Sequence, residues 1–116
     1  MIEINNLTTS KVDEKFLKRV ARKVLKGENK EGIDLSIALV GQTRIRKLNK
    51  KYRGKNRATD VLSFGNDLNE IVICLREVKK QELARVLIHG ILHLLKYKHS
   101  KKMQKKEEIY GKAIYY

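Results

Sequence analysis

Hydrophobic and polar residues alternate with two different periods along the first third of the chain. Apolar residues at every second position in residues 2–4 predict a short strand. In residues 12–25 they recur every three or four positions, which predicts an amphipathic helix with Ser10 as its N-cap. Alternation returns in residues 33–40, so we expect a second strand there with one well-buried face.

The middle of the chain combines a short helix with two β-rich segments. Thr43 can cap a helix that ends near Gly54 and directs Ile45, Leu48 and Tyr52 inward. The runs "VLSF" and "EIVIC", separated by "GNDLN", are rich in residues that favour strands. They predict a connected pair of strands.

Two helices are expected to end the chain. The first begins at about Glu77 and directs apolar side chains such as Leu87 and Ile91 toward the core. The second follows His99 and carries on one stripe Met103, Glu107, Tyr110 and Ile114. No repeat or linker interrupts the pattern, so we expect one α+β domain over residues 1–116, a small mixed sheet of about four strands with helices packed on it.

Composition agrees with a folded domain. Of 116 residues, 41% are apolar, 34% are charged and none is proline, as in folded rather than disordered proteins. No apolar run approaches the roughly 18 residues of a membrane span. The N-terminus lacks the pattern of a secretory signal, so we expect a cytoplasmic protein. The single cysteine, Cys74, lies in an apolar run and is interpreted as a core residue.

The charge distribution indicates a polyanionic partner. Twenty-seven Lys and Arg against thirteen Asp and Glu leave a net charge of +14, which attracts nucleic acid by displacing its counterions. The alternative is a solubilising surface, with the lysine excess of a thermophile or of an AT-rich genome. Clustering favours nucleic acid: residues 44–57 hold eight basic groups and residues 96–106 hold six, with no acid in either segment.

All three histidines lie within the eleven residues "HGILHLLKYKH". His89 and His93 are four residues apart, so a helix places both on one face, where they can bind one ion. His99 can join them only if the helix ends near Lys96 and the chain turns back. Three imidazoles without a thiolate resemble catalytic zinc sites that keep one open position. The alternative is that the three side chains never meet.

The residue after the first histidine limits the class of zinc enzyme to which this chain can belong. Metalloproteases of the H-E-x-x-H type place their general base there, and here the residue is Gly90. A peptidase would therefore lack its base.

Two separated motifs resemble one known family. "HGILHLLKYKH" resembles the H-G-x-L-H-L-x-G-Y-D-H signature of the YbeY family, bacterial metal-dependent single-strand endoribonucleases linked to ribosomal RNA maturation and ribosome quality control. "LNKKYRGKNRATDVLSF", residues 48–64, is similar to that family's L-N-x-x-Y-R-x-x-x-x-x-T-D-V-L-S-F segment at every named position. The resemblance implies a zincin-like α+β fold with a metal-binding helix near the C-terminus.

The resemblance also implies roles for individual residues. The metal ligands would be His89, His93 and His99, holding one zinc ion per chain, and Arg53 would be the functional arginine. A guanidinium suits that role because its fork of donors fits phosphate oxygens. Asp60 and its neighbour Thr59 read as a turn beside the site, with Asp60 as a possible partner of an arginine or a histidine N–H.

Two positions depart from the family signature. Lys96 replaces a glycine and Lys98 replaces an aspartate. A left-handed lysine costs on the order of 1 kcal/mol, and the lost carboxylate could alter the metal site. The two lysines would instead strengthen phosphate binding.

These observations favour a metal-dependent endoribonuclease that acts on ribosomal RNA. The other reading is a non-catalytic RNA- or ribosome-binding module in which the metal only pins the last two helices. Candidate RNA-binding residues are Lys50, Lys51, Lys55, Arg57, Lys96 and Lys98.

Overall fold

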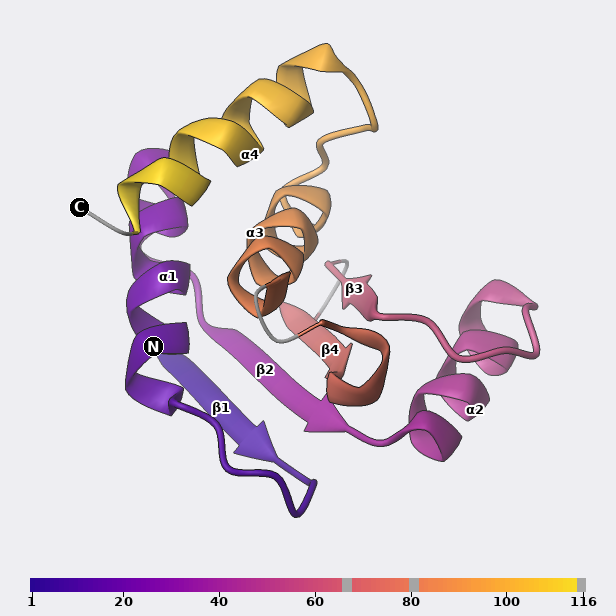
Figure 1. Cartoon of the computed structure of the whole chain (residues 1–116). Coiled ribbons are helices and arrows are strands. Elements are labelled where there is room, and N and C mark those ends of the chain that lie inside the picture. The colour runs from indigo at the N-terminus through magenta and orange to yellow at the C-terminus, as the bar shows by residue number, and fades with distance from the viewer. Residues whose placement is uncertain (66–67, 80–81, 115–116) are drawn as a thin grey trace.

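The computed structural model describes residues 1–65, 68–79 and 82–114, which form one α+β unit around a four-stranded mixed sheet (Figure 1). The strands are β1 (Ile2–Asn6), β2 (Leu35–Val40), β3 (Val61–Phe64) and β4 (Glu70–Cys74), in the spatial order β1-β2-β4-β3. β1, β2 and β4 are parallel, and β3 pairs antiparallel with β4. The predicted α+β class and the pairing of the two β-rich runs are confirmed. Residues 66–67 of the "GNDLN" connection lie outside the described residues.

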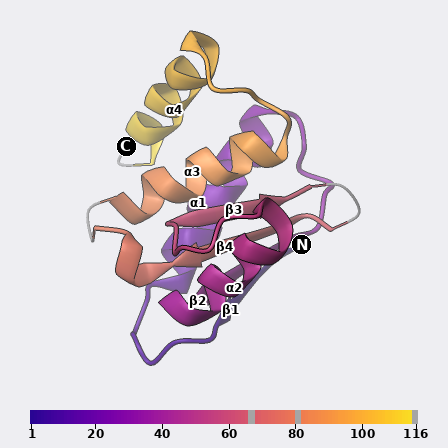
Figure 2. The same cartoon turned by 90° about the vertical axis from the view of Figure 1, so that its right-hand side faces the viewer.

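Helical segments accompany the sheet in the part of the chain that the structure describes. They are α1 (Glu14–Gly27), α2 (Gln42–Arg53), the 3₁₀ turn η1 (Leu75–Glu77), α3 (Leu83–Leu94) and α4 (Lys101–Ala113). Figure 2 shows α2 on one side of the sheet and α1 and α3 on the other. No helix among the described residues is both long and apolar enough to cross a bilayer.

Alternation along the strands separates two apolar layers. The larger layer joins α1, α3 and α4 to one face of the sheet through the strand residues Leu35, Ile37, Leu39, Ile71 and Ile73. The smaller layer lies under α2 and contains Ala38, Val40, Ile45, Leu62, Val72 and Cys74. Cys74 is fully buried, as predicted.

The N-cap of α1 is not the predicted residue. The carboxylate of Asp13 accepts a hydrogen bond from the Phe16 N–H at 3.0 Å, so the helix begins at Glu14. Ser10 belongs to the preceding loop, where its N–H donates to Thr8 Oγ1 (3.2 Å) and its carbonyl accepts from Asn6 (2.8 Å). Its backbone is thus held in a turn.

The prediction for α2 was right about its end and wrong about its beginning. Gly41, not Thr43, is the N-cap, because the first helical turn already includes the Ile45 N–H donating to the Gly41 carbonyl at 3.2 Å. Gly54 ends the helix in the left-handed conformation, with φ of 70°.

Tyr52 does not point into the core as predicted. It is 53% exposed, because the smaller apolar layer takes only Ile45 and Leu48 from α2 and the last turn of the helix extends past it. The ring of Tyr52 contacts Phe64 instead.

The helix expected from about Glu77 begins later, at Leu83. At the end of β4 the chain makes the single turn η1, and Val78 then has extended backbone angles, which interrupts any continuous helix. Residues 80–81, inside the predicted helix, lie outside the described residues.

Gly90 allows α3 to approach the sheet closely. A Cβ atom at this position would lie 3.1 Å from Val61 Cγ2 and 3.2 Å from Ile71 Cγ2, tighter than ordinary van der Waals contact. The helix that carries two histidines is therefore held directly against β3 and β4.

Candidate metal centre and cleft

α3 ends where the sequence required it to end. Lys96 is left-handed, with φ of 75°; the Tyr97 N–H donates to the Leu92 carbonyl at 3.0 Å and the Lys96 N–H to the His93 carbonyl at 2.9 Å. This is the Schellman pattern of helix ends. The chain then reverses, and Ser100 caps α4 by accepting from the Met103 N–H at 3.3 Å. His99 is thereby returned to the face that carries the other two histidines.

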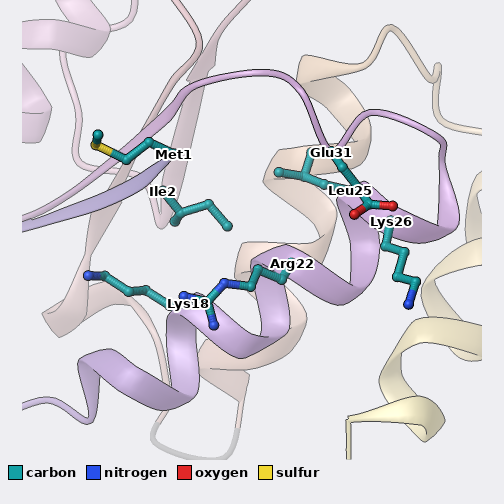
Figure 3. A pocket seen from close by; sticks show the side chains of 7 residues that line it. All are labelled: Met1, Ile2, Lys18, Arg22, Leu25, Lys26 and Glu31. Atoms are coloured by element: carbon teal, nitrogen blue, oxygen red, sulfur yellow. The ribbon is translucent and has the colours of Figure 1, made fainter.

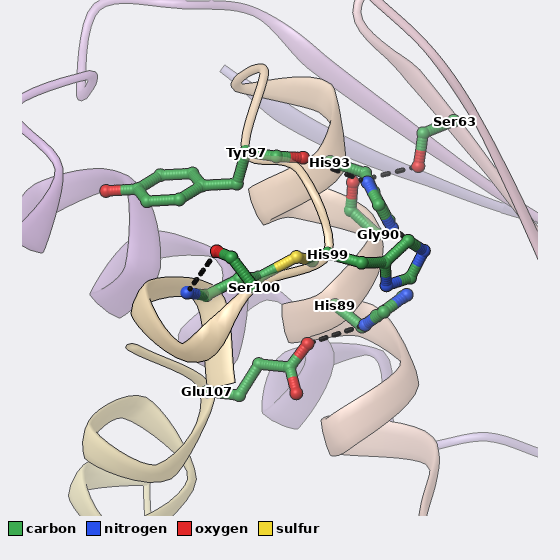
Figure 4. Close-up of polar contacts among 9 residues, drawn as sticks. Ser63, His89, Gly90, His93, Tyr97, His99, Ser100 and Glu107 are labelled. Atoms are coloured by element: carbon green, nitrogen blue, oxygen red, sulfur yellow. Dashed lines mark hydrogen bonds and ion pairs between the residues drawn. The ribbon is translucent and has the colours of Figure 1, made fainter. Parts of the chain in front are cut away.

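The three imidazoles come together in space, as Figure 4 shows. Their ring centroids lie 4.4 to 5.3 Å apart. The Nε2 atoms of His93 and His99 are 3.0 Å apart, and one ring nitrogen from each of the three lies within 4.8 Å of the others. Such a cluster could hold a metal ion.

Hydrogen bonds orient two of the rings. His89 Nδ1 lies 2.5 Å from Glu107 Oε1, and His93 Nδ1 lies 3.1 Å from the Tyr97 carbonyl (Figure 4). Each acceptor favours a proton on Nδ1, which leaves the Nε2 lone pair for a metal. The sequence placed Glu107 on the inward stripe of the last helix but assigned it no role. The sequence signal for such a role was the presence of a carboxylate on a stripe whose other residues are apolar.

The electrostatic surroundings keep His93 suitable as a ligand. Burial lowers the pKa of its imidazole below the usual value, and neighbouring His89 and His99 lower the pKa further. The Tyr97 carbonyl and Glu107 act in the opposite direction but do not reverse the shift. Because a neutral imidazole is the form that binds metal, His93 is available at neutral pH.

One partly buried carboxylate anchors the elements around the histidines. Glu28, at the end of α1, accepts hydrogen bonds from the hydroxyls of Tyr97 (2.5 Å) and Tyr110 and lies 3.3 Å from Lys106 Nζ. Tyr97 belongs to the loop between α3 and α4, and the other two belong to α4. Glu28 thus ties α1 to both segments that orient the histidines. Sequence reasoning missed it, because its partners are 69 and more positions away along the chain.

The histidines open into a cleft of about 580 Å³ beside β3. Its other walls come from the end of α2 and the segment that leads into β3, with the cations Arg53, Lys55 and Arg57 and the acid Asp60. Arg53 Nη2 donates to the Ser63 carbonyl at 2.9 Å, and Ser63 Oγ donates to the Gly90 carbonyl at 2.8 Å. Arg53 is therefore connected through β3 to the histidine helix.

The other predicted RNA-binding residues lie outside this cleft. Lys50 lines a neighbouring hollow of about 790 Å³ along α2, and the Lys51 ammonium lies over the Tyr52 ring. Lys96 and Lys98 are exposed on the α3–α4 loop and do not line the cleft. The basic residues are thus spread along the surface on both sides of the cleft.

Two further polar residues shape the cleft wall. Asp60 lines it, but His89 Nδ1 pairs with Glu107 rather than with Asp60, whose Oδ1 lies 3.5 Å from Thr59 Oγ1. Asn49 is 3% exposed and donates through Nδ2 to the Arg57 carbonyl at 2.9 Å. It fixes the segment that carries the cleft cations.

A second hollow, of about 490 Å³, lies between α1 and β1 (Figure 3). Lys18, Arg22 and Lys26 follow one side of α1 at every fourth position, opposite Met1 and Ile2. The hollow contains no histidine, and long flexible cations around an apolar floor form a solvated rim. The cleft beside β3 is therefore the candidate site.

Comparisons with known proteins identify the family of this chain. Residues 3–113 match the family described as Endoribonuclease YbeY. Relatives named Endoribonuclease YbeY include proteins of Sulfurihydrogenibium sp., 40% identical over 84% of this chain and 78% of its own length, and Persephonella marina, 37% identical over 78% and 72%. The fold resembles the solution structure of TM1509 from Thermotoga maritima, with a TM-score of 0.68 and 30% identity, covering 99% of this chain and 89% of that chain. This chain belongs to the Endoribonuclease YbeY family.

Proposed function

We propose that this protein is a metal-dependent endoribonuclease that cuts single-stranded RNA. One observation carries the proposal: three clustered imidazoles open into a cleft whose other walls present Arg53, Lys55 and Arg57. Nitrogen ligands suit a metal, and the cations suit a phosphodiester. Membership of the Endoribonuclease YbeY family supports RNA as the substrate.

The donor set fits one zinc ion. The separation of 3.0 Å between His93 Nε2 and His99 Nε2 is close to the roughly 3.3 Å expected between two nitrogens bound tetrahedrally to one zinc. Two unprotonated nitrogens this close repel each other unless they share a cation or a proton. His89, His93 and His99 would hold the ion, and a three-histidine set leaves a coordination position open. A bound zinc ion supplies Lewis-acid polarisation and makes water more acidic.

The residues of the cleft would bind and orient the RNA. Arg53 has five N–H donors, and its bond to the Ser63 carbonyl uses one of them, so the others can bind phosphate oxygens as a fork. Arg53 would then stabilise charge that develops at phosphorus. Lys55 and Arg57 line the same cleft and would hold the adjacent backbone.

We further propose that ribosomal RNA is the physiological substrate and that the enzyme works in the cytoplasm. A net charge of +14 favours a large polyanion over a small substrate.

A binding module with a structural metal is the second candidate. The observation that favours it is that the ligands belong to α3 and the following loop, while Glu107 of α4 pairs with His89. A metal at this position would also fasten the last two helices together.

Metal analysis and RNA cleavage together test the proposal. We expect protein purified without chelator to hold about one zinc per chain, to cut single-stranded RNA in preference to duplex RNA, and to stop when a chelator is added. His93→Ala should lose metal and cleavage while circular dichroism shows that it remains folded. Metal-loaded protein that binds RNA without cutting it would favour the binding module. Cleavage by His93→Ala would point to a contaminating nuclease.

A further inference from the structure

Tyr52 is an aromatic side chain that does not pack in the hydrophobic core. It is 53% exposed, and it is the only exposed phenylalanine or tyrosine within 1–65, 68–79 and 82–114. Tyr52 follows Lys50 and Lys51, which lie outside the cleft, and directly precedes the cleft residue Arg53 at the end of α2. An exposed tyrosine here is therefore placed at the edge of the proposed RNA path.

Contacts around Tyr52 hold it beside the cleft rather than leaving it to swing freely. Its ring meets Phe64 edge to face, with centroids 5.2 Å apart and an interplanar angle of 70°. The next pair along the two elements, Arg53 and Ser63, is joined by the 2.9 Å hydrogen bond. Both Arg53 and Ser63 line the cleft, so the ring pair stands immediately outside its rim.

One cation lies against each ring of the pair. Lys51 Nζ lies 5.2 Å from the centre of the Tyr52 ring, and Arg53 Cζ lies 5.8 Å from the centre of the Phe64 ring. Proteins that bind single-stranded nucleic acid combine these same elements, a basic track for phosphates and aromatic faces on which bases stack. A base in a duplex is already stacked and paired, so it cannot use such a face.

We propose that Tyr52, supported by Phe64, stacks an unpaired base of the RNA next to the phosphate bound by Arg53. The inference rests on the proposed function, because it assumes that RNA enters the cleft. It adds a base-binding position to a site described so far only by charge and metal ligands. Stacking accepts any base, so this position would select for single-stranded structure and not for sequence.

Equilibrium binding tests the proposal without depending on cleavage. The probe is a short single-stranded oligonucleotide of 2′-O-methyl RNA, shown by gel to stay intact. We expect Tyr52→Ala to bind it about 5- to 100-fold more weakly, the range of one stacked base, while Tyr52→Trp binds as tightly as wild type. Ile109→Ala is the matched control, since Ile109 is 52% exposed but lies on α4, and its affinity should not change.

Two further measurements separate stacking from charge. Removing Tyr52 should leave the salt dependence of binding unchanged, because no phosphate contact is lost. An oligonucleotide in which abasic sites replace the bases should bind wild type and Tyr52→Ala equally, since the partner of the ring is gone. Equal binding of the intact oligonucleotide by wild type and Tyr52→Ala would overturn the inference and leave the proposed function standing. Failure of wild type to bind any single strand would overturn both.

Discussion

Lys96 occupies a conformation that favours glycine. Its φ of 75° puts Cβ close to the backbone, and glycine stands at this position in the family signature. Lys96→Gly should therefore raise the free energy of unfolding of the metal-free protein by about 0.5–1 kcal/mol, the steric cost being partly offset by the greater freedom of unfolded glycine. Urea denaturation measures the change. Lys98→Gly, two residues on and without positive φ, should be neutral or destabilising, and an equal gain there would contradict the explanation.

Glu107 is expected to set the metal affinity through His89. Its carboxylate holds Nδ1 of His89 at 2.5 Å, and such partners typically contribute 10- to 100-fold to metal binding. Glu107→Gln should weaken zinc binding by about that factor, measured by competition with a chromophoric chelator. Glu108→Gln is the control, because Glu108 is exposed and adjacent. Comparable losses of zinc affinity in both variants would mean that Glu107 acts only through its negative charge and not through its contact with His89.

Arg53 should act on the transition state more than on binding. Arg53→Lys keeps the charge but loses the fork of donors, so single-turnover cleavage of single-stranded RNA should fall roughly ten- to a thousandfold, or about 1.4 to 4 kcal/mol on the barrier. Affinity should change little. Arg44→Lys, an exposed position of α2 away from the cleft, provides the comparison. A rate equal to that of wild type would assign Arg53 to the basic surface.

At the level of elements, Glu28 joins α1 to the two segments around the histidines. Burial raises the pKa of this carboxyl, but hydrogen bonds from Tyr110, Tyr97 and Lys106 outweigh burial and hold the pKa below its usual value. A carboxyl with a depressed pKa stabilises the fold above its unfolded pKa, and the contribution is lost as the pH falls through the folded value.

Glu28→Gln is therefore expected to be less stable than wild type at pH 7 by about 1–3 kcal/mol. The difference should shrink as the pH falls below about 4.5, where the wild-type carboxyl takes up its proton. Urea denaturation of both metal-free proteins at pH 7, 5 and 3.5 measures the effect. Glu31→Gln, in the exposed turn after α1, should show no such pH-dependent gap. A gap that stays constant with pH would mean that the ionised carboxylate is not responsible.

At the scale of the whole molecule, the basic residues behind the net charge of +14 are not expected to contribute equally to RNA binding. The basic residues of α2 and the following loop border the cleft, so RNA binding should weaken steeply with salt as counterions return to the phosphates. Neutralising Lys50, Lys51 and Lys55 to Gln should reduce the slope of log K against log salt by up to about 2, since each lost phosphate contact removes about 0.7 in single strands.

A variant with the same loss of charge elsewhere isolates the role of position. Gln at three exposed lysines near α1, Lys11, Lys15 and Lys30, should change the slope much less. Equal slopes for the two triple variants would mean that the positive charge acts only as a diffuse field.

Much of the fold was encoded in local patterns. The period of two in residues 33–40 and the period of three to four in residues 12–25 identified β2 and α1, because each period records which side of an element is buried. Helix boundaries were harder to predict than the helices themselves. Asp13 and Ser10 are both good N-cap residues, and hydrogen bonds in the loop decided which of them caps α1. The strand order β1-β2-β4-β3 had no signature in any single segment.

The sequence by itself determined the histidine spacing, the need for a turn near Lys96 and the concentration of basic residues. These are local properties, because a helix fixes the geometry of residues four apart and composition fixes charge. Tertiary structure alone decided that Glu107 orients His89, that Glu28 joins Tyr97 and Tyr110 across 69 and 82 positions, and that Tyr52 faces outward beside the cleft. Such contacts depend on how whole elements pack against one another. The periodicity of one segment shows which of its faces is buried, but it does not show which residue of another segment will contact that face.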